Sequence, residues 1–307
     1  GTPPTVAEMV RRLKAAGAVL VGKLWMPMGR GAPPSRNAWN LDHSPGSSST
    51  GPGAAMGARE VAFALGEQTA GSHLRPAMYN GVVGLKPTHG RITRDGMISG
   101  SWTLDHVGIM APSVDDTALI YALLAGPDPV DPSTIDEPAP APTVSLDGFR
   151  PPRIGLVREY FMDTSEGYMQ ASVEAALSRL AAAGAEVATA DLGPEFRLTW
   201  YAHGVVSASE GHAKRAQFKN GPLRGRTPSG RTLFLPDELG RIIPTPYYLQ
   251  AQRLRRYVNG QLAALLSTQF DVLLTPTAFA QAPRFVDGSG DPSFQTCWSF
   301  LGLPTIQ

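Results

Sequence analysis

The chain has 307 residues, of which 42% are hydrophobic and 17% charged, and its formal net charge at pH 7 is +1. That length is enough for one large domain or two ordinary ones with a substantial buried core. The balanced charge gives no electrostatic reason to expect nucleic acid or an anionic membrane as a partner. Apolar runs are shorter than the roughly 18 residues of a membrane span, and Cys297, the single cysteine, excludes an internal disulfide framework. We therefore expect a cytoplasmic protein.

The first predicted elements are an amphipathic helix and a strand. Apolar residues at helical spacing lie between Thr5, a suitable N-cap, and Gly17, a suitable terminator. The β-branched run at 18–21 predicts a buried strand directly after that helix.

The same order of helix, break and strand recurs twice in the second half. A helical pattern at 172–180 precedes a strand pattern at 186–188, and a helical pattern at 249–266 precedes a strand at 271–277. This repetition predicts an α/β fold with a large, mixed and mostly parallel sheet that helices cover on both sides. Arginines 253, 255 and 256 fit a solvated face of the last helix.

The chain is predicted to be a single domain in three parts. Residues 128–152 are rich in proline and acidic residues and predict an exposed connector between a motif-bearing part, 1–127, and a variable part, 153–307. The sequence leaves open whether this connector separates two domains or crosses the surface of one. Residues 221–239 predict a long loop or a lid. Both ends interrupt a structured pattern, so we expect the chain to be incomplete at each.

Two glycine- and serine-rich segments carry the strongest chemical signal. Residues 44–53 are all small or turn-forming, and a Thr-Ala-Gly-Ser turn ends at Ser72, 24 residues after Ser48. Consecutive backbone N–H groups in such a turn can converge on the oxyanion of an acyl-transfer reaction. Because a serine nucleophile must be activated by a neighbour, Ser72 is predicted as the nucleophile and Ser48 as its proton relay. His73 is interpreted as a bystander, since successive side chains usually diverge.

These segments resemble the amidase signature family of serine amidohydrolases. The resemblance is carried by residues 45–55 and 66–77 and by the run Gly-Val-Val-Gly-Leu-Lys-Pro-Thr-His-Gly-Arg at 81–91. It continues over nearly the whole chain in further motifs, at 104–108, 113–118 and 271–277.

The resemblance implies a Ser–cis-Ser–Lys catalytic unit. Ser72 matches the nucleophile, Ser48 matches the cis-peptide serine, and the backbone N–H groups of Thr69, Ala70, Gly71 and Ser72 match the oxyanion hole. The implied reaction is hydrolysis of a small carboxamide to a carboxylate and ammonia or an amine through a serine acyl-enzyme. Neither a metal nor an organic cofactor is implied.

Several residues depart from the family pattern. Lys23 matches a segment downstream of the family's catalytic lysine, and Lys86 matches a structural position, so the resemblance implies a catalytic lysine before residue 1. Glu67 and Gln68 replace the usual Thr or Ser and Asp, and Arg75 stands three residues after the nucleophile rather than two. These changes predict a divergent branch of the family.

Three functions are left open by the sequence. The favoured one is an amide hydrolase with a small-molecule amide as partner, a homodimer being compatible with it, and with neither nucleic acid nor a membrane. The second is the glutaminase subunit of a tRNA-dependent amidotransferase, which requires partner subunits. The third is a non-catalytic fragment or pseudoenzyme, if residues 1–307 are the complete protein. Tyr201, His203 and Tyr247 could line a pocket, although core or surface positions suit each better.

Overall fold

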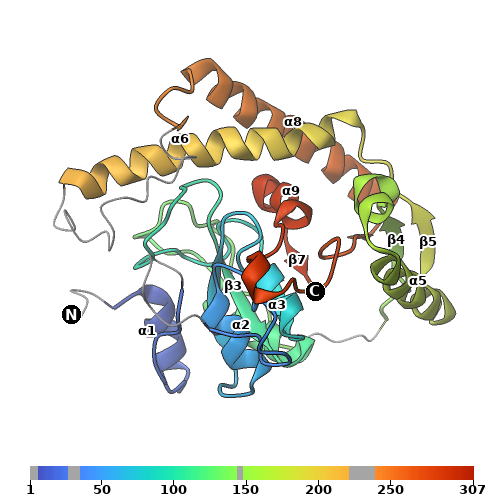
Figure 1. Cartoon of the computed structure of the whole chain (residues 1–307), viewed down its shortest axis with the longest axis horizontal. Helices are drawn as coiled ribbons and strands as arrows, with labels where there is room; N and C mark the ends of the chain where they lie inside the picture. Colours follow the sequence, from blue (N-terminus) through green and yellow to red (C-terminus); the bar gives the residue numbers. More distant parts are fainter. Residues whose placement is uncertain (1–5, 27–34, 144–147, 221–238) are drawn as a thin grey trace.

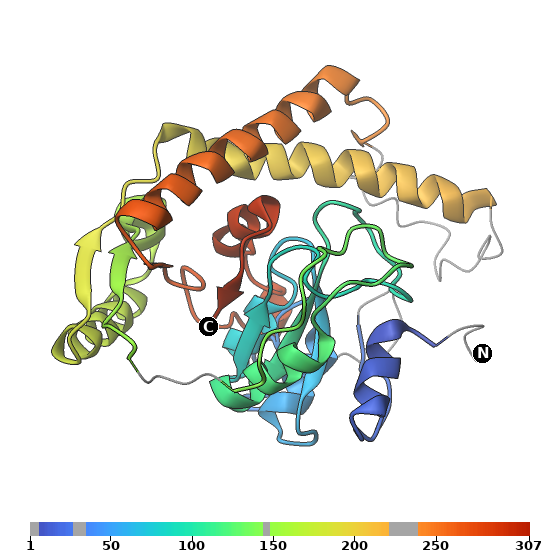
Figure 2. The same cartoon turned by 180° about the vertical axis from the view of Figure 1, so that it is seen from behind.

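The computed structural model describes residues 6–26, 35–143, 148–220 and 239–307, and for residues 215–220 the backbone alone. Figures 1 and 2 show two long helices crossing one side of the molecule, an antiparallel sheet on the other side and a small parallel sheet at one end. None of the helices in the described ranges is long and apolar enough to cross a membrane. Almost all of the loop predicted at 221–239 lies outside the described residues.

The first sheet is antiparallel and holds the motif-bearing part together. Its four strands, in spatial order, are β1, β3, β2 and β7. Their bounds are β1 Ala64–Gln68, β2 Val83–Lys86, β3 His106–Ala111 and β7 Thr305–Ile306. The strand β3 is buried along its whole length, because it lies between two strands and beneath the helices of this half. Those helices are α1 Glu8–Ala15, α2 Thr50–Gly57, α3 Leu74–Tyr79 and α4 Val114–Leu124.

The second sheet is parallel and has three strands in the order β5, β4 and β6. Their bounds are β4 Arg153–Leu156, β5 Glu186–Thr189 and β6 Val272–Leu274. Parallel neighbours need long crossover connections, and the chain supplies a helix, α5 Gly167–Ala182, between β4 and β5. The α/β class and the mixed strand directions are confirmed. In the described residues, however, the strands form two sheets rather than one large sheet, and only the smaller is parallel.

The largest hydrophobic cluster lies under the long helices α6 Thr199–Asn220 and α8 Thr245–Thr268. A third helix, α9 Ser293–Leu301, packs beneath them (Figure 1) and buries all of its residues except the first, Ser293, which is partly buried. Aromatic rings fill the space, with Phe161 and Trp298 stacked at a centroid distance of 5.8 Å. Short turns join these elements at η1 Arg158–Met162, η2 Pro194–Leu198 and η3 Phe285–Asp287. This core fixes α9 beside the motif-bearing sheet.

Most helices predicted from the sequence are present, but the strand predicted at 18–21 is wrong. The helix α1 ends as predicted, with Gly17 at φ +88° and the Ala18 N–H donating to the Leu13 carbonyl oxygen. The apolar run that follows is extended without pairing, and Val19 and Val21 are 86% and 79% exposed. A strand needs a neighbour for its backbone groups, and no described segment pairs with this one. Thr5 lies outside the described residues.

Two predicted surface features are partly buried instead. In the connector, Asp128 and Asp131 are buried, because they accept hydrogen bonds from the Thr93 hydroxyl and from the Arg94 backbone N–H. On α8, the Arg255 side chain turns inward and donates to the Thr103 carbonyl oxygen at 2.9 Å. Acidic and basic residues can therefore be buried here where backbone and hydroxyl groups provide partners. The division into residues 1–127, 128–152 and 153–307 stays a prediction.

Candidate active site

The structure brings the two glycine- and serine-rich segments into contact. The Ser49 backbone N–H donates to the Ser72 carbonyl oxygen at 3.0 Å. The Ser49 hydroxyl is bonded to both backbone groups of Glu67, accepting from its N–H at 3.1 Å and donating to its carbonyl oxygen at 3.2 Å. The peptide bond between Ser47 and Ser48 is cis. Ser48 and Ser72 therefore lie on neighbouring segments, joined by one backbone–backbone hydrogen bond and by the contacts of the Ser49 hydroxyl.

The turn that carries Ser72 lies between β1 and α3 and is held by Gln68. The Gln68 amide oxygen accepts from the backbone N–H groups of His73 and Leu74, both at 2.9 Å. Its amide nitrogen donates to the Ser299 hydroxyl at 2.9 Å, and that hydroxyl donates to the Ala70 carbonyl oxygen at 2.6 Å. The first N–H groups of a helix lack partners within the helix, so Gln68 satisfies two of them. A glutamine can replace the aspartate that is usual in the family at this position. Its amide oxygen accepts the two backbone hydrogen bonds, and its amide nitrogen donates the third hydrogen bond to Ser299.

A buried carboxylate holds the start of the same turn. The Thr69 hydroxyl donates to Asp105 Oδ1 at 2.6 Å, and Asp105 Oδ2 accepts from the Ser99 hydroxyl and from two backbone N–H groups. The Thr69 carbonyl oxygen accepts from His203 Nε2 at 3.0 Å. Burial lowers the pKa of His203, which favours the neutral ring with the proton on Nε2. Four consecutive residues, Thr69 to Ser72, are thereby fixed from several sides.

Glycine is required where the turn packs most closely. A Cβ atom added at Gly71 would lie 2.5 Å from Gln295 Oε1 and 2.9 Å from Pro292 Cβ. Gly71 is thus covered by Pro292 and the first turn of α9. A larger side chain at position 71 would displace that segment or the turn itself.

His73 is part of the packing, as expected for a bystander. Its ring is fully buried, and Nε2 lies 3.0 Å from the Ile109 carbonyl oxygen, to which it donates. Burial lowers the pKa of His73 to about 4, so the ring is neutral at physiological pH. An added Cβ at Gly66 would lie 2.6 Å from His73 Nδ1, and one at Gly108 would lie 2.3 Å from the ring. Two glycines on adjacent strands therefore make the space for this ring.

Neither lysine singled out from the sequence is bonded to the two serines. Lys23 is exposed. Lys86 is fully buried and its Nζ donates to the Leu303 carbonyl oxygen; burial lowers the pKa of Lys86 to about 7. Among the described residues, no lysine forms a hydrogen bond with Ser48 or Ser72. Lys86 instead attaches β2 to the chain just before β7.

Arg75 joins the cis-peptide loop to a loop of the second half. Its side chain is only 5% exposed and donates from Nη2 to the Ser47 carbonyl oxygen at 2.7 Å and from Nη1 to the Gly290 carbonyl oxygen at 2.8 Å. The position of this arginine, one residue later than is usual in the family, thus has a structural role. It fixes the backbone next to Ser48.

Replacing Arg75 with methionine should lower the free energy of unfolding by about 2 kcal/mol. Methionine fills a similar volume but leaves two partly buried carbonyl oxygens without their donor, and each loss in a buried site costs about 1–3 kcal/mol, which partial exposure and relief of the buried charge partly offset. Urea unfolding of the full-length protein measures the effect. Arg253→Met, at an exposed position on α8, is the matched control and should be close to neutral. Equal stability of the two variants would contradict this role for Arg75.

The pKa of Glu67 makes the free energy of unfolding depend on pH. Burial, with a smaller contribution from the negative charge of Asp105, raises the pKa of Glu67 from 4.5 to about 7. The folded state therefore holds the proton more tightly than the unfolded state. The stability from the protonated carboxyl is complete below about pH 4.5 and is lost as the pH rises through about 7.

Glu67→Gln should consequently match the unaltered protein at pH 4.5 and exceed its stability by on the order of 2 to 3 kcal/mol at pH 8. The glutamine imitates the protonated carboxyl and does not ionise. Urea unfolding at both pH values gives the difference, in which the contributions of all other titrating groups cancel. Glu60→Gln, at an exposed position, should follow the unaltered protein. A constant difference between Glu67→Gln and the unaltered protein over this range would contradict the raised pKa.

The motif geometry agrees with comparisons to known proteins. The sequence model of the Amidase family matches residues 2–305. The chain belongs to the amidase family. It is 34% identical over 319 residues to the A subunit of the glutamyl-tRNA(Gln) amidotransferase of Moorella thermoacetica, covering 94% of this chain and 65% of that protein. The corresponding protein of Roseiflexus castenholzii is 35% identical, with 95% and 65% covered. The chain thus spans less than two thirds of the length of these relatives.

Solved structures of other amidase-family enzymes have the same fold. Peptide amidase from Stenotrophomonas maltophilia superposes with a TM-score of 0.81 at 30% identity, covering 100% of this chain and 70% of that one. A 6-aminohexanoate cyclic dimer hydrolase superposes with a TM-score of 0.83 at 27% identity, with 98% and 70% covered. The α/β fold class and the family predicted from the sequence are confirmed. The catalytic roles of Ser72, Ser48 and the 69–72 turn stay predictions.

Sequence reasoning missed several residues that hold this amidase-family turn. Asp105 stands out in the sequence only as part of a motif, and Gln68 only as a departure from the family pattern. Ser299 lies more than two hundred positions from the turn that it contacts, and no local signal marks it. His203 is buried as expected, yet it reaches Thr69, whereas Tyr201 and Tyr247 are 77% and 58% exposed.

Proposed function

We propose that this chain carries the nucleophile and the oxyanion turn of an amide hydrolase. Ser72 Oγ attacks the carbonyl carbon of a small carboxamide, and the carbonyl oxygen becomes an oxyanion. Backbone N–H groups among Thr69, Ala70, Gly71 and Ser72 stabilise that charge. Ser48 takes the proton of Ser72 and returns it to the departing amine, which leaves an acyl-enzyme. Water then releases the carboxylate and restores Ser72.

The observation that supports this proposal most is the hydrogen bond from the Ser49 N–H to the Ser72 carbonyl oxygen, at 3.0 Å. It unites two segments that are separated in the sequence and that each have the composition of a catalytic loop. A pair of unrelated glycine-rich linkers would have no reason to meet in this way. The contacts of Gln68, Asp105 and Ser299 further support a turn held ready before substrate binds, since a preorganised oxyanion hole does not reorganise during reaction.

The relay also needs a base. His73 does not fill this role in the proposal, because its neutral ring is buried against β3 and donates to Ile109. We keep the prediction that the family's catalytic lysine lies before residue 1. Such a lysine is a base near neutral pH only where burial or a neighbouring charge lowers its pKa.

A serine-directed phosphonate tests the chemistry directly. The full-length protein should react with one equivalent of the reagent, and digestion followed by mass spectrometry should place the label on Ser72. Ser178→Ala, which alters an exposed serine of α5, should label like the unaltered protein, whereas Ser72→Ala should not label. A label on any other residue would overturn the proposed nucleophile.

A second candidate is the glutaminase subunit of an amidotransferase. It is favoured by the names of the relatives described above, which are amidotransferase subunits. This candidate predicts ammonia release from glutamine that depends on co-purifying subunits. Hydrolysis of simple carboxamides by the isolated full-length protein, without such a dependence, would favour the first candidate. Absence of both activities and of phosphonate labelling would favour a non-catalytic protein.

A further inference from the structure

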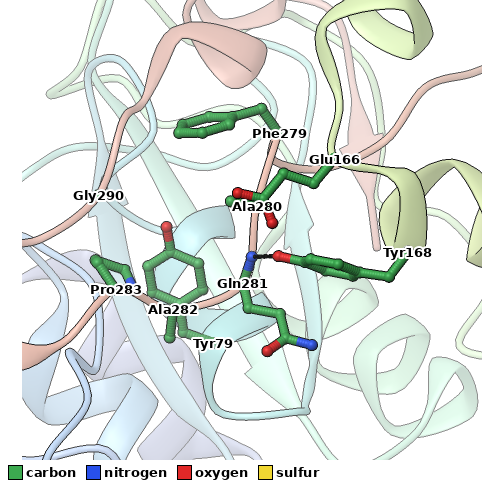
Figure 3. Close-up of a pocket in the computed structure, with 9 residues that line it drawn as sticks. All are labelled: Tyr79, Glu166, Tyr168, Phe279, Ala280, Gln281, Ala282, Pro283 and Gly290. Carbon is green, nitrogen blue, oxygen red and sulfur yellow. Dashed lines mark hydrogen bonds between the residues drawn. The ribbon is translucent and has the colours of Figure 1, made fainter.

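A pocket of about 350 Å³ lies where three elements meet. Tyr79 comes from the end of α3, Glu166 and Tyr168 come from the start of α5, and Phe279 begins the loop at 279–283 that closes the third side (Figure 3). Small-molecule pockets in proteins span about 300–1,000 Å³, so this one suits a small ligand.

The lining combines aromatic rings with a carboxylate. Figure 3 shows the side chains of Tyr79, Tyr168 and Phe279 arranged around a common space, with the Glu166 carboxylate among them. The face of an aromatic ring carries negative potential and attracts cations within about 6 Å of its centroid. None of the residues that line the pocket is basic. Glu166 forms no ion pair with a lysine or arginine in the described part of the chain.

Two further charged groups act on the Tyr79 side of the pocket. Asp291 acts electrostatically on the Tyr79 hydroxyl, as does Arg75 with the opposite sign. The Arg75 guanidinium is already engaged by the carbonyl oxygens of Ser47 and Gly290. The pocket therefore has the Glu166 carboxylate in its lining, the Asp291 carboxylate near Tyr79, and one guanidinium nearby that backbone groups hold in place.

The walls are fixed without a ligand. The Tyr79 side chain is 8% exposed, and Gly290, at φ +79°, approaches it so closely that an added Cβ would lie 2.1 Å from the Tyr79 hydroxyl oxygen. The Glu166 backbone N–H donates to the Phe279 carbonyl oxygen at 2.8 Å, and the Gln281 backbone N–H donates to the Tyr168 hydroxyl. A preformed pocket loses little ordering entropy when it binds.

We propose that this pocket binds a small organic ammonium ion, with the rings of Tyr79, Tyr168 and Phe279 around the cation and the Glu166 carboxylate neutralising its charge. An apolar stem attached to the nitrogen contacts the ring edges and the alanines of the 279–283 loop. The rings and the carboxylate give no such electrostatic stabilisation to an anion or to a neutral alcohol of the same size. The inference concerns binding alone and holds independently of the hydrolytic chemistry at Ser72.

Calorimetric titration of the full-length protein with benzylammonium chloride and with benzyl alcohol, its near-isostere, tests the proposal. At pH 7 benzylammonium should bind at one site per chain and about 5- to 30-fold more tightly than the alcohol. The test reads binding without turnover, so it can be run on the Ser72→Ala variant as well, and a failed hydrolase assignment would leave its result unchanged. Equal affinities, or no binding of benzylammonium up to millimolar concentrations, would overturn the proposal.

Variants locate the site. Glu166→Gln, at an exposed side chain, should bring the two affinities to within about twofold, and Tyr168→Leu should weaken benzylammonium binding severalfold. Glu60→Gln removes an exposed carboxylate on the loop between α2 and β1 and should bind like the unaltered protein. If Glu166→Gln keeps the full preference for the cation, or if Glu60→Gln loses it, the ammonium binds elsewhere and the assignment is wrong.

Discussion

Replacing Ser72 with alanine in the full-length protein should lower amide turnover by about 10⁴-fold or more. The reason is that no acyl-enzyme can form, and the oxyanion turn and substrate binding alone provide only the residual acceleration. The structure also predicts normal folding of this variant, since the backbone contact that joins the two segments uses the Ser72 carbonyl oxygen rather than its hydroxyl. Ammonia release from a panel of small carboxamides measures the effect, with thermal unfolding measured in parallel.

Ser178→Ala provides the control for this result. It removes a hydroxyl from the exposed face of α5 and should retain both turnover and stability. Turnover by Ser72→Ala at a level close to that of the control would remove Ser72 from the mechanism. A loss of turnover together with a large loss of stability would instead point to a folding defect and contradict the backbone role described above.

Thr69→Val should reduce kcat by about 10- to 100-fold with a smaller change in KM. Valine has the shape of threonine but cannot donate to Asp105, so the start of the turn loses its 2.6 Å hydrogen bond. Loss of a complete oxyanion donor costs about 10²–10³-fold in kcat, and displacement of the turn should cost somewhat less. The effect falls on kcat because the oxyanion exists only in the transition state and the intermediates. Steady-state kinetics with one carboxamide separate the two constants.

Two conservative variants test whether this hydrogen bond is responsible. Thr69→Ser keeps the hydroxyl and should recover most of kcat. Asp105→Asn can direct its amide oxygen toward the N–H groups of Gly100 and Ser101 and its amide nitrogen toward the Thr69 oxygen, so it should also retain substantial activity. If Thr69→Ser were as slow as Thr69→Val, the methyl packing rather than the hydrogen bond would position the turn.

Much of this site was readable from local sequence because its chemistry depends on backbone conformation. Glycine and small residues at 44–53 and 66–72 are the ones that permit close approach and exposed N–H groups, and their composition is visible without any structure. The residues that form hydrogen bonds with the 69–72 turn could not be predicted from local sequence. Ser299 and His203 contact the turn only because α9 and α6 pack beside it, and no local pattern encodes such a contact.

The apolar runs predicted as strands form strands only where a second segment pairs with them. The runs at 186–188 and 271–277 resemble the run at 18–21 in apolar, β-branched character, yet only the first two pair, each with β4. Pairing satisfies backbone groups through a second segment, so a strand is a property of two segments and not of one. The antiparallel direction of β1, β2 and β3 was missed for the same reason.

The sequence by itself determined the family, the α/β class and the two segments that form the candidate site, because each is specified by residue types at short spacing. The tertiary structure alone decided that Asp105, Gln68, Ser299 and His203 hold the turn, and that Arg75 connects the cis-peptide loop to the second half. It alone also created the aromatic pocket between α3 and α5. Hydrogen bonds and packing between residues distant in the chain depend on how the elements are assembled, and the core beneath α6 and α8 fixes that assembly.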